Sequence, residues 1–388
     1  INLLPLATFA MDTYGDDPCT CFRLKGEPEY SQSEMLLDVK MHKAISIIQF
    51  KVEGQIIKKN PGLKMDSRNL LHHINFETGT VEIDGKEYPM LDMNFPTIDP
   101  KRPYALTREE EDIMERLEKA FLHCEKLQRH MRFLLNKGGL YKVYNKNLLY
   151  HGCVPLTETG ELKSVKLYGR SYKGKGLYEA LESYVRKGFY ALDPKEKERG
   201  RDMMWFIWLS EGSPLFGKDK MATFERYFLA DKETHKEKKN PYYSMLENEE
   251  VVNRILEEFG LPAEGTHIIN GHVPVKSKNG ENPIKCGGKV LVIDGGFSKA
   301  YQKETGIAGY TLIYNSYGLI LAAHEPFEST EAAIEKESDI HSDSIIVKRV
   351  VQRKLVGDTD IGRELKEQIA DLEMLLEAYR SGRIRERL

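Results

Sequence analysis

The stretch NLLYHGCVP, residues 147–155, runs from an apolar strand into His151, which is followed directly by glycine and four residues later by proline. A second stretch, HIINGHVPVK at residues 267–276, repeats this arrangement around His272, with glycine before the histidine and proline two residues after it. Layered α/β folds gather their ligands at strand ends. Glycine lets the backbone approach a metal or phosphate closely, and neutral imidazole is a common metal ligand. The matched contexts predict that His151 and His272 bind a metal. A hydrogen-bonded core role for each remains the alternative.

The segments around these histidines mix helices and strands. Apolar spacing predicts a helix over residues 32–59 that ends at Asn-Pro-Gly, and a capping box at Thr107 and Glu110 begins a second helix that runs to residues 138–139. Further helices are expected at 176–190, 247–259 and 361–380, and residues 231–242 form the best candidate loop. Strands are expected at 140–144, 148–150, 266–270, 289–294, 310–315 and 319–324.

Composition excludes several classes of protein. The chain has 388 residues, 40% of them hydrophobic and 30% charged, which is ordinary for a globular protein with a large core. A net charge of −3 gives no electrostatic case for nucleic acid or an anionic membrane, and no apolar run is long enough to span a bilayer. Five cysteines, an odd and small number, favour a reducing, cytoplasmic location.

Several longer runs carry a family resemblance. NLLYHGCVP resembles the histidine motif of the calcineurin-like metallophosphatase superfamily, and INGHVPVK at residues 269–276 resembles its final Gly-His motif. SPLFGKDKMATFERYF at 213–228, LVIDGGFSKAY at 291–301 and GIAGYTL at 306–312 resemble signatures of the class III, bacterial, fructose-1,6-bisphosphatases within that superfamily. The similarity extends over nearly the whole chain.

The resemblance implies an α/β (α+β) fold, a β-sandwich flanked by helices with large helical insertions. Residues 1–30, 136–160 and 261–330 would belong to the metallophosphatase core. Residues 31–135 would form a helical and β insertion, 161–260 a helical insertion, and 331–388 a C-terminal helical extension.

The resemblance also implies a reaction, a step of gluconeogenesis in carbohydrate metabolism. A two-metal site would activate water to hydrolyse fructose 1,6-bisphosphate to fructose 6-phosphate and phosphate, with Mn²⁺ as the preferred ion. His151 and His272 would bind the same one of the two metals. Candidates for binding a substrate phosphate are Lys276, Lys218, Lys220, Ser298 and Lys299, whose alternative role is solvated surface.

Part of the expected site is absent from the printed sequence. In the superfamily, Asp-x-His, Gly-Asp-x-x-Asp-Arg and Gly-Asn-His motifs precede the first histidine motif and supply the other metal ligands and an acid histidine, and none of the three occurs before His151 in this sequence. No catalytic acid or base is therefore assigned to this chain. We expect these motifs to lie before Ile1, which opens an apolar stretch without a start methionine.

Three functions follow as alternatives: a sugar bisphosphatase, a phosphoesterase acting on another phosphomonoester or a phosphoprotein, and a non-catalytic module. The apolar stripe of the helix at 361–380 is expected to form packing or a subunit contact rather than a long coiled coil, because it covers fewer than the three to four heptads that a coiled coil needs, so a homo-oligomer is one possible assembly.

Overall fold

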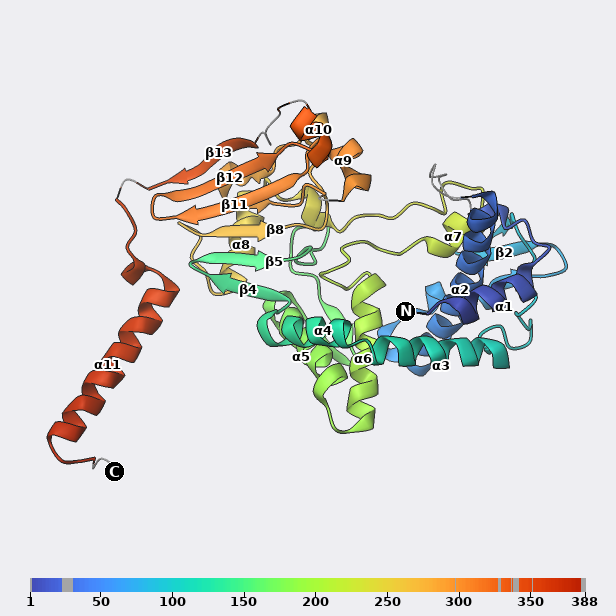
Figure 1. Cartoon of the computed structure of the whole chain (residues 1–388), viewed down its shortest axis with the longest axis horizontal. Helices are drawn as coiled ribbons and strands as arrows, with labels where there is room; N and C mark the ends of the chain where they lie inside the picture. Colours follow the sequence, from blue (N-terminus) through green and yellow to red (C-terminus); the bar gives the residue numbers. More distant parts are fainter. Residues whose placement is uncertain are drawn as a thin grey trace. The chain divides into compact units, whose positions relative to one another are not determined.

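A computed structural model describes residues 2–22, 31–296, 298–326, 329–335, 337, 342–350 and 352–384. The chain divides into two compact units, which are described separately (Figure 1). Unit 1 contains residues 1–139 and 164–240, and unit 2 contains residues 140–163 and 241–388.

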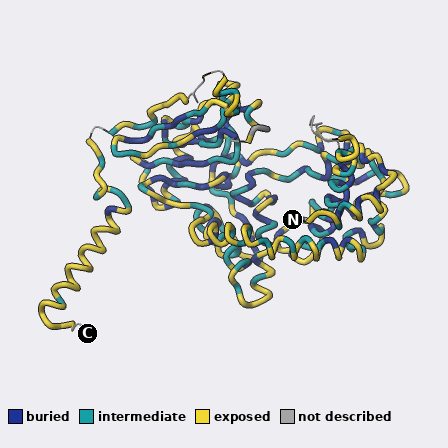
Figure 2. The backbone as a smooth tube through the Cα atoms, in the orientation of Figure 1, coloured by how far each residue is buried: buried dark blue, intermediate teal, exposed yellow. Residues whose placement is uncertain are grey.

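Unit 2 is built on two sheets that share an apolar interior. The first has the strand order β4-β5-β8-β10-β9 and the second the order β11-β12-β13. Ile269 and Leu291 of the first sheet and Leu319 of the second form one buried cluster, so the sheets pack face to face as a sandwich. Figure 2 shows dark blue, buried residues along the central strands of this unit. The strands are β4 (Tyr141–Tyr144), β5 (Asn147–Tyr150), β8 (His267–Asn270), β9 (Ile284–Lys285), β10 (Val290–Val292), β11 (Gly309–Asn315), β12 (Gly318–His324) and β13 (Ser342–Arg349).

The three central strands of the first sheet run parallel. Leu148 of β5 lies opposite Ile268 of β8, and Leu291 of β10 lies opposite Ile269. Because side chains alternate along a strand, Ile269 and Leu291 face the second sheet while Ile268 points to the opposite face. Phe259, which caps helix α8 (Glu249–Glu258), packs its ring on those of Tyr141 and Tyr150. The carboxyl ends of β5, β8 and β10 therefore meet at one edge of a buried sheet.

The remaining helices of unit 2 are short, except for the last. They are α9 (Lys299–Thr305), α10 (Thr330–Glu335) and α11 (Asp360–Arg380). The expected helix at 361–380 is confirmed, and Thr359 caps its first turn by accepting from Gly362 N. Residues 331–388 hold the strand β13 as well as helices, because the β-branched run Ile345-Ile346-Val347 favours an extended backbone.

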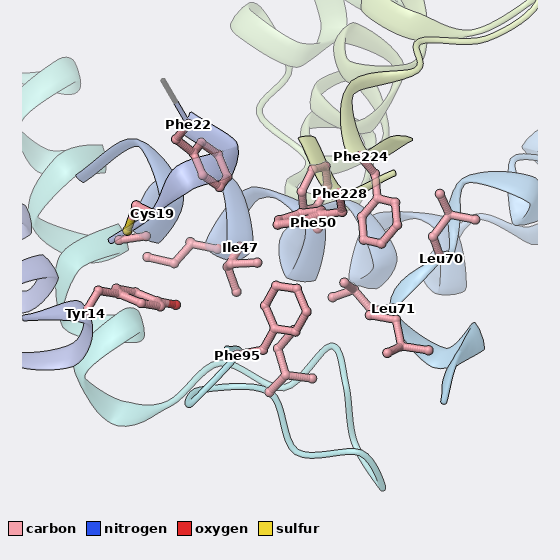
Figure 3. Packing of buried hydrophobic residues seen from close by; sticks show 14 of the residues in the cluster. Tyr14, Cys19, Phe22, Ile47, Phe50, Leu70, Leu71, Phe95, Phe224 and Phe228 are labelled. Carbon is pink, nitrogen blue, oxygen red and sulfur yellow. The ribbon is translucent and has the colours of Figure 1, made fainter. Parts of the chain in front are cut away.

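Unit 1 is organised around the long helix α2 (Gln32–Lys59). Its bounds agree with the expected helix, because Ser31 and Glu34 form a capping box and Asn60-Pro61 ends the apolar pattern. Figure 3 shows Ile47 and Phe50 of α2 inside a buried cluster that also includes Tyr14, Phe95 and Phe228. The other elements are α1 (Leu4–Tyr14), β1 (Ile74–Asn75), β2 (Thr80–Ile83), β3 (Lys86–Pro89), α3 (Arg108–Leu122), α4 (Glu125–Lys137), β6 (Val165–Leu167), β7 (Arg170–Tyr172), α5 (Gly174–Tyr190), α6 (Pro194–Leu209) and α7 (Thr223–Phe228).

Three lysines of α2 lie inside unit 1 and are 1% exposed or less. Lys40 donates to the carbonyls of residues 14 and 15. Lys43 Nζ lies 2.5 Å from Asp17 and 2.7 Å from Asp92, and Lys51 Nζ lies 2.7 Å from Glu110 and 2.6 Å from the carbonyl of residue 97. A buried charge is tolerated only when it is paired in this way. These contacts tie α2 to segments far away in the sequence.

One expected element is wrong. The helix expected to run unbroken from Thr107 to residues 138–139 is two helices, α3 and α4, separated at His123 and Cys124. The backbone N–H of His123 donates to Lys119 O, and a ring nitrogen of the same residue lies 2.7 Å from that oxygen. Cys124 then takes an extended conformation, and no glycine or proline marks the break.

Glu53 of α2 provides a test of how unit 1 responds to pH. It is 6% exposed, and burial raises the pKa of its carboxyl above the ordinary value of 4.5, although Gln49 and Arg68 partly offset that effect. The stability that comes from a protonated Glu53 is complete below pH 4.5 and is lost as the pH rises through the raised folded pKa. Glu53→Gln, which mimics the neutral form, is expected to raise the urea midpoint of unit 1 at pH 7 and to leave it unchanged at pH 4.

Tryptophan fluorescence suits this measurement, because both tryptophans of the chain, Trp205 and Trp208, belong to α6 of unit 1. Glu82→Gln, on the exposed side of β2, is the matched control and is expected to leave the midpoint unchanged at both values. A Glu53→Gln midpoint that falls at pH 7 would contradict the sign of the effect.

The observed architecture confirms the expected mixed α+β class, with a β-sandwich in unit 2. The assignment of individual segments as metallophosphatase core or insertion stays a prediction. Within the described residues, no helix combines the length and apolar character needed to cross a membrane.

Candidate metal centre

Three polar residues follow the parallel strands of the first sheet. His151 comes directly after β5, His272 two residues after β8, and Asp294 two residues after β10. Parallel strands present their carboxyl ends at one edge, so the topology brings these three segments together. Backbone bonds fix the arrangement: Gly271 N donates to His151 O at 2.9 Å, and Val275 N donates to Asp294 O at 2.8 Å.

The two histidine rings contact each other directly. Nε2 of His151 lies 2.9 Å from Nδ1 of His272, and the ring centroids are 4.8 Å apart with planes inclined by 66°. A hydrogen bond between two neutral imidazoles has this length. Two imidazole nitrogens at about 2.0–2.1 Å from one ion, and about 90° apart around it, are also separated by about 2.9 Å. The separation is therefore compatible with a hydrogen bond between the rings and with two adjacent positions of one metal ion, and metal binding stays a prediction.

The backbone at His272 is strained. Its φ is +68°, a left-handed conformation that side chains other than glycine seldom adopt. Val273 N donates to Gly271 O at 2.8 Å, which closes a three-residue turn with His272 at its centre. Such a conformation costs on the order of 1–3 kcal/mol and is typical of functional sites. The turn points the His272 ring to the edge where His151 lies.

Partial burial favours the neutral form of the His151 ring. Burial lowers the pKa of His151 below its ordinary value of 6.5, and the negative charge of Asp294 offsets part of that effect. Asp294 is held by Gly296 N, which donates to Asp294 Oδ1 at 2.9 Å. A neutral imidazole beside a carboxylate is the state in which a histidine binds a metal ion.

Asn270 ties the two histidine segments together. This last residue of β8 is 2% exposed, and its Nδ2 donates to Gly152 O at 3.0 Å, directly after His151. Its Oδ1 is buried and has no hydrogen-bond partner among the described residues. A buried polar atom left without a partner is uncommon and is typical of sites that complete their bonding with an ion or ligand.

Among the described residues, the candidate metal ligands are two ring nitrogens, one from His151 and one from His272. Over that part of the chain, no group of three or more His, Cys, Asp or Glu side chains is placed to hold a metal ion. Cys153 is fully buried two residues after His151, and burial raises the pKa of its thiol to about 12, which favours the protonated form. Catalytic metal sites use about three protein ligands, so metal binding by His151 and His272 stays a prediction that needs further ligands.

The candidate phosphate-binding residues fall in different places. Lys218 and Lys220 belong to unit 1, where Lys218 Nζ lies 2.7 Å from Glu237 and Lys220 Nζ lies 3.6 Å from Glu225. Lys276 is exposed in unit 2, four residues after His272, and Ser298 is also exposed there. The side chain of Lys299 lies outside the described residues. A phosphate-binding role for these five residues stays a prediction.

Sequence reasoning missed Asp294 and Asn270. Both stand at the end of an apolar strand, as the histidines do, so the same signal marks them. Asp294 lies inside a run that resembles a family signature, and Asn270 directly precedes the Gly-His motif, so neither residue stands out as a separate candidate.

Comparison with known proteins gives a consistent result. The family model described as Firmicute fructose-1,6-bisphosphatase matches residues 1–381. The proteins named "Fructose-1,6-bisphosphatase class 3" from Alkaliphilus metalliredigens and Clostridium novyi are both 57% identical to the chain over its whole length. The chain covers 59% of the first of these relatives and 58% of the second. No solved structure matches.

Proposed function

Because this chain belongs to the Firmicute fructose-1,6-bisphosphatase family, we propose that its full-length gene product hydrolyses fructose 1,6-bisphosphate to fructose 6-phosphate and phosphate. The chain spans less than two thirds of the length of the curated relatives that it matches. The activity of the whole protein is therefore a proposal. The observation that carries the proposal is the contact between His151 and His272 at one edge of the sheet. Relatives of this chain are named fructose-1,6-bisphosphatase class 3.

The two histidines supply neutral nitrogens to one divalent ion, which we propose is Mn²⁺. When bound, such an ion supplies Lewis-acid stabilisation to a phosphoryl group under attack by water. The strained turn at His272 fixes one ring, and Asn270 fixes the segment that carries the other. Asp294 places negative charge beside His151, which favours binding of a cation there. Lys276 follows the His272 turn by four residues, and we propose that its ammonium group binds a phosphate of the substrate.

A substrate panel tests the proposal. The full-length gene product is freed of metal with a chelator, supplied with Mn²⁺, Mg²⁺ or Zn²⁺ in turn, and assayed for phosphate release. The substrates are fructose 1,6-bisphosphate, fructose 6-phosphate and a phosphoserine peptide. The proposal expects fructose 1,6-bisphosphate to give the highest kcat/KM, with activity lost in chelator and restored best by Mn²⁺. A higher kcat/KM for the phosphopeptide would assign the same site to phosphoprotein hydrolysis instead.

Asn270→Ala is expected to weaken metal binding without changing the chemistry at saturation. The substitution leaves Gly152 O without its partner and frees the segment that holds His151. Loss of a group that orients a metal ligand typically costs about 10–100-fold in metal affinity. The Mn²⁺ concentration for half-maximal activity should rise by that factor, and kcat at saturating Mn²⁺ should stay within about twofold. Asn282→Ala, on the surface of unit 2, is the control and should change neither value.

The apolar face of α11 supports a second proposal, that two copies of this chain pair through it. Figure 2 shows the helix as exposed along most of its length. Five apolar residues on one face of this helix are 41–63% exposed and recur at spacings of four and three residues, the pattern of a coiled-coil seam. They are Leu365, Ile369, Leu372, Leu376 and Tyr379.

Charge selects the orientation of this pair. In an antiparallel pair Leu365 meets Leu376 of the second copy, and Lys366 of each helix falls beside Glu373 of the other. A parallel pair places Gln368 beside Glu373 and forms no ion pair of this kind. A seam of about two heptads is short, so the two ion pairs and the apolar layers act together.

Leu372→Glu is expected to convert the dimer into monomers. The two-fold axis introduces the carboxylate twice into the apolar seam, where burial of even a neutral polar group costs about 1–3 kcal/mol. The dissociation constant should therefore rise about 100-fold or more. Sedimentation velocity over a concentration series measures it. Glu367→Ala, on the opposite face of α11, is the control and should leave the dimer intact. A wild-type protein that sediments as a monomer at high concentration would contradict the pairing.

A further inference from the structure

A cationic cavity lies at the other end of the strands that carry the histidines. It belongs to unit 2 and has a volume of about 580 Å³, within the range usual for small-molecule sites. The turn between β4 and β5, strands β11 and β13, the segment after β13 and the first turn of α11 all contribute to its wall. Its cationic residues are Lys146, Lys348, Arg353, Lys354 and Arg363.

The acidic residues of the cavity are already engaged. Asp360 pairs with Arg363 and accepts a hydrogen bond from Asn145 N at 2.7 Å. Asp358 Oδ2 accepts from Leu355 N at 2.9 Å. Across the described residues, no carboxylate forms an ion pair with Lys146, Lys348 or Lys354. The cavity therefore presents a surplus of positive charge.

The surplus of positive charge lowers the pKa values of neighbouring groups. Burial lowers the pKa of Lys348, and the charges of Lys354 and Lys146 lower it further. Burial also lowers the pKa of His267 at the start of β8, and Lys348 and Lys354 add to that effect although Gly288 O opposes it. Like charges held together at partly buried positions cost free energy unless an anion neutralises them. Lys348 is half-buried, so its ammonium is not an ordinary solvated surface group.

The cavity is separate from the metal centre. Lys146 directly precedes β5 and His151 directly follows it. Five residues of extended chain span about 16 Å, and Gly265 and His272 flank β8 in the same order. The cavity thus opens at the amino ends of β5 and β8, and the histidine pair lies at their carboxyl ends.

We propose that this cavity binds a small molecule carrying two or more phosphate groups, with Lys146, Lys348 and Lys354 as its principal contacts. Ammonium groups bind phosphate as point charges and need no fixed fork geometry. The ring of Tyr314 lies 5.4 Å from Lys354 Nζ and gives the wall an apolar face for the body of the ligand. This proposal does not depend on the bisphosphatase activity, because it concerns different residues at the opposite edge of the sheet.

Calorimetric titration of the full chain with pyrophosphate tests the site. Metal-free buffer of low ionic strength prevents binding through a divalent ion. Lys348→Gln/Lys354→Gln is expected to weaken binding at least about tenfold, while Lys142→Gln, an exposed lysine of β4, leaves it within about twofold. His151→Ala/His272→Ala should also retain the affinity of the wild-type protein. Raising the salt concentration should weaken wild-type binding, because the attraction is electrostatic.

Several results would overturn the proposal. These are no pyrophosphate binding by the wild-type chain, equal affinity in Lys348→Gln/Lys354→Gln, or an equal loss in Lys142→Gln. Tighter binding of a single-stranded oligonucleotide than of pyrophosphate would reject a small-molecule ligand. Thermal unfolding without ligand controls for folding: removal of the mutual repulsion should leave the double variant at least as stable as the wild type. If it is less stable, the single variant Lys354→Gln replaces it with the same criteria.

Discussion

Replacing His151 with alanine in the full-length gene product is expected to lower kcat/KM for fructose 1,6-bisphosphate by at least about 10³-fold. The variant removes one of the two nitrogens that meet at the sheet edge, where Nε2 lies 2.9 Å from the His272 ring. A metal ion contributes several kcal/mol to phosphoryl transfer, and each 1.36 kcal/mol is a factor of ten in rate. Phosphate release at saturating Mn²⁺ measures the loss.

His267→Asn is the matched control for this experiment. His267 begins the strand β8 that leads to His272, but its ring lies 2.9 Å from Gly288 O, and an asparagine amide can donate to the same oxygen. Its activity should remain within about threefold of the wild type. Full activity in His151→Ala with unchanged Mn²⁺ binding would show that this histidine is a hydrogen-bonded residue of the sheet edge and not a metal ligand.

Lys51→Met is expected to cause the largest loss of stability of any single change considered. It leaves the Glu110 carboxylate, 1% exposed, without its cation inside unit 1. Breaking one side of a buried ion pair costs about 3–5 kcal/mol. Urea unfolding followed by the fluorescence of Trp205 and Trp208 reports on this unit. Adding Glu110→Gln to Lys51→Met should recover part of the loss, because the stranded charge is then removed.

Lys58→Met separates this effect from the loss of a lysine in general. Lys58 is exposed on the same helix, so the control should change the free energy of unfolding by less than about 0.5 kcal/mol. If Lys51→Met were as stable as the control, the buried pair with Glu110 would not hold α2 in place.

The sequence predicted correctly those helices and strands whose start and end are both marked by neighbouring residues. The bounds of α2 agree with the expectation because a capping box begins the helix and Asn60-Pro61 ends it. The strand positions around β5 and β8 follow from short apolar runs bounded by turns. The contact of His151 with His272 follows from two matched strand ends, once the strands pair in parallel.

What the sequence did not predict depends on distant partners. The break between α3 and α4 is an exception, because its hydrogen bonds from His123 to Lys119 O are local, but no glycine or proline marks it. The burial of Lys43 and Lys51 within a charged-looking helix depends on Asp17 and Glu110, 26 and 59 residues away along the chain. The cavity at the amino ends of the strands likewise joins lysines that are about 200 residues apart.

The central claim is that His151 and His272 hold a single divalent ion at the carboxyl ends of β5 and β8. The most direct test is an anomalous difference map at the manganese absorption edge, from crystals of the full-length gene product grown with Mn²⁺. We expect a peak within bonding distance of both rings, accompanied by ligands from outside the donor set of this chain. A fully occupied manganese peak elsewhere, with the two rings still hydrogen-bonded to each other, would contradict the claim.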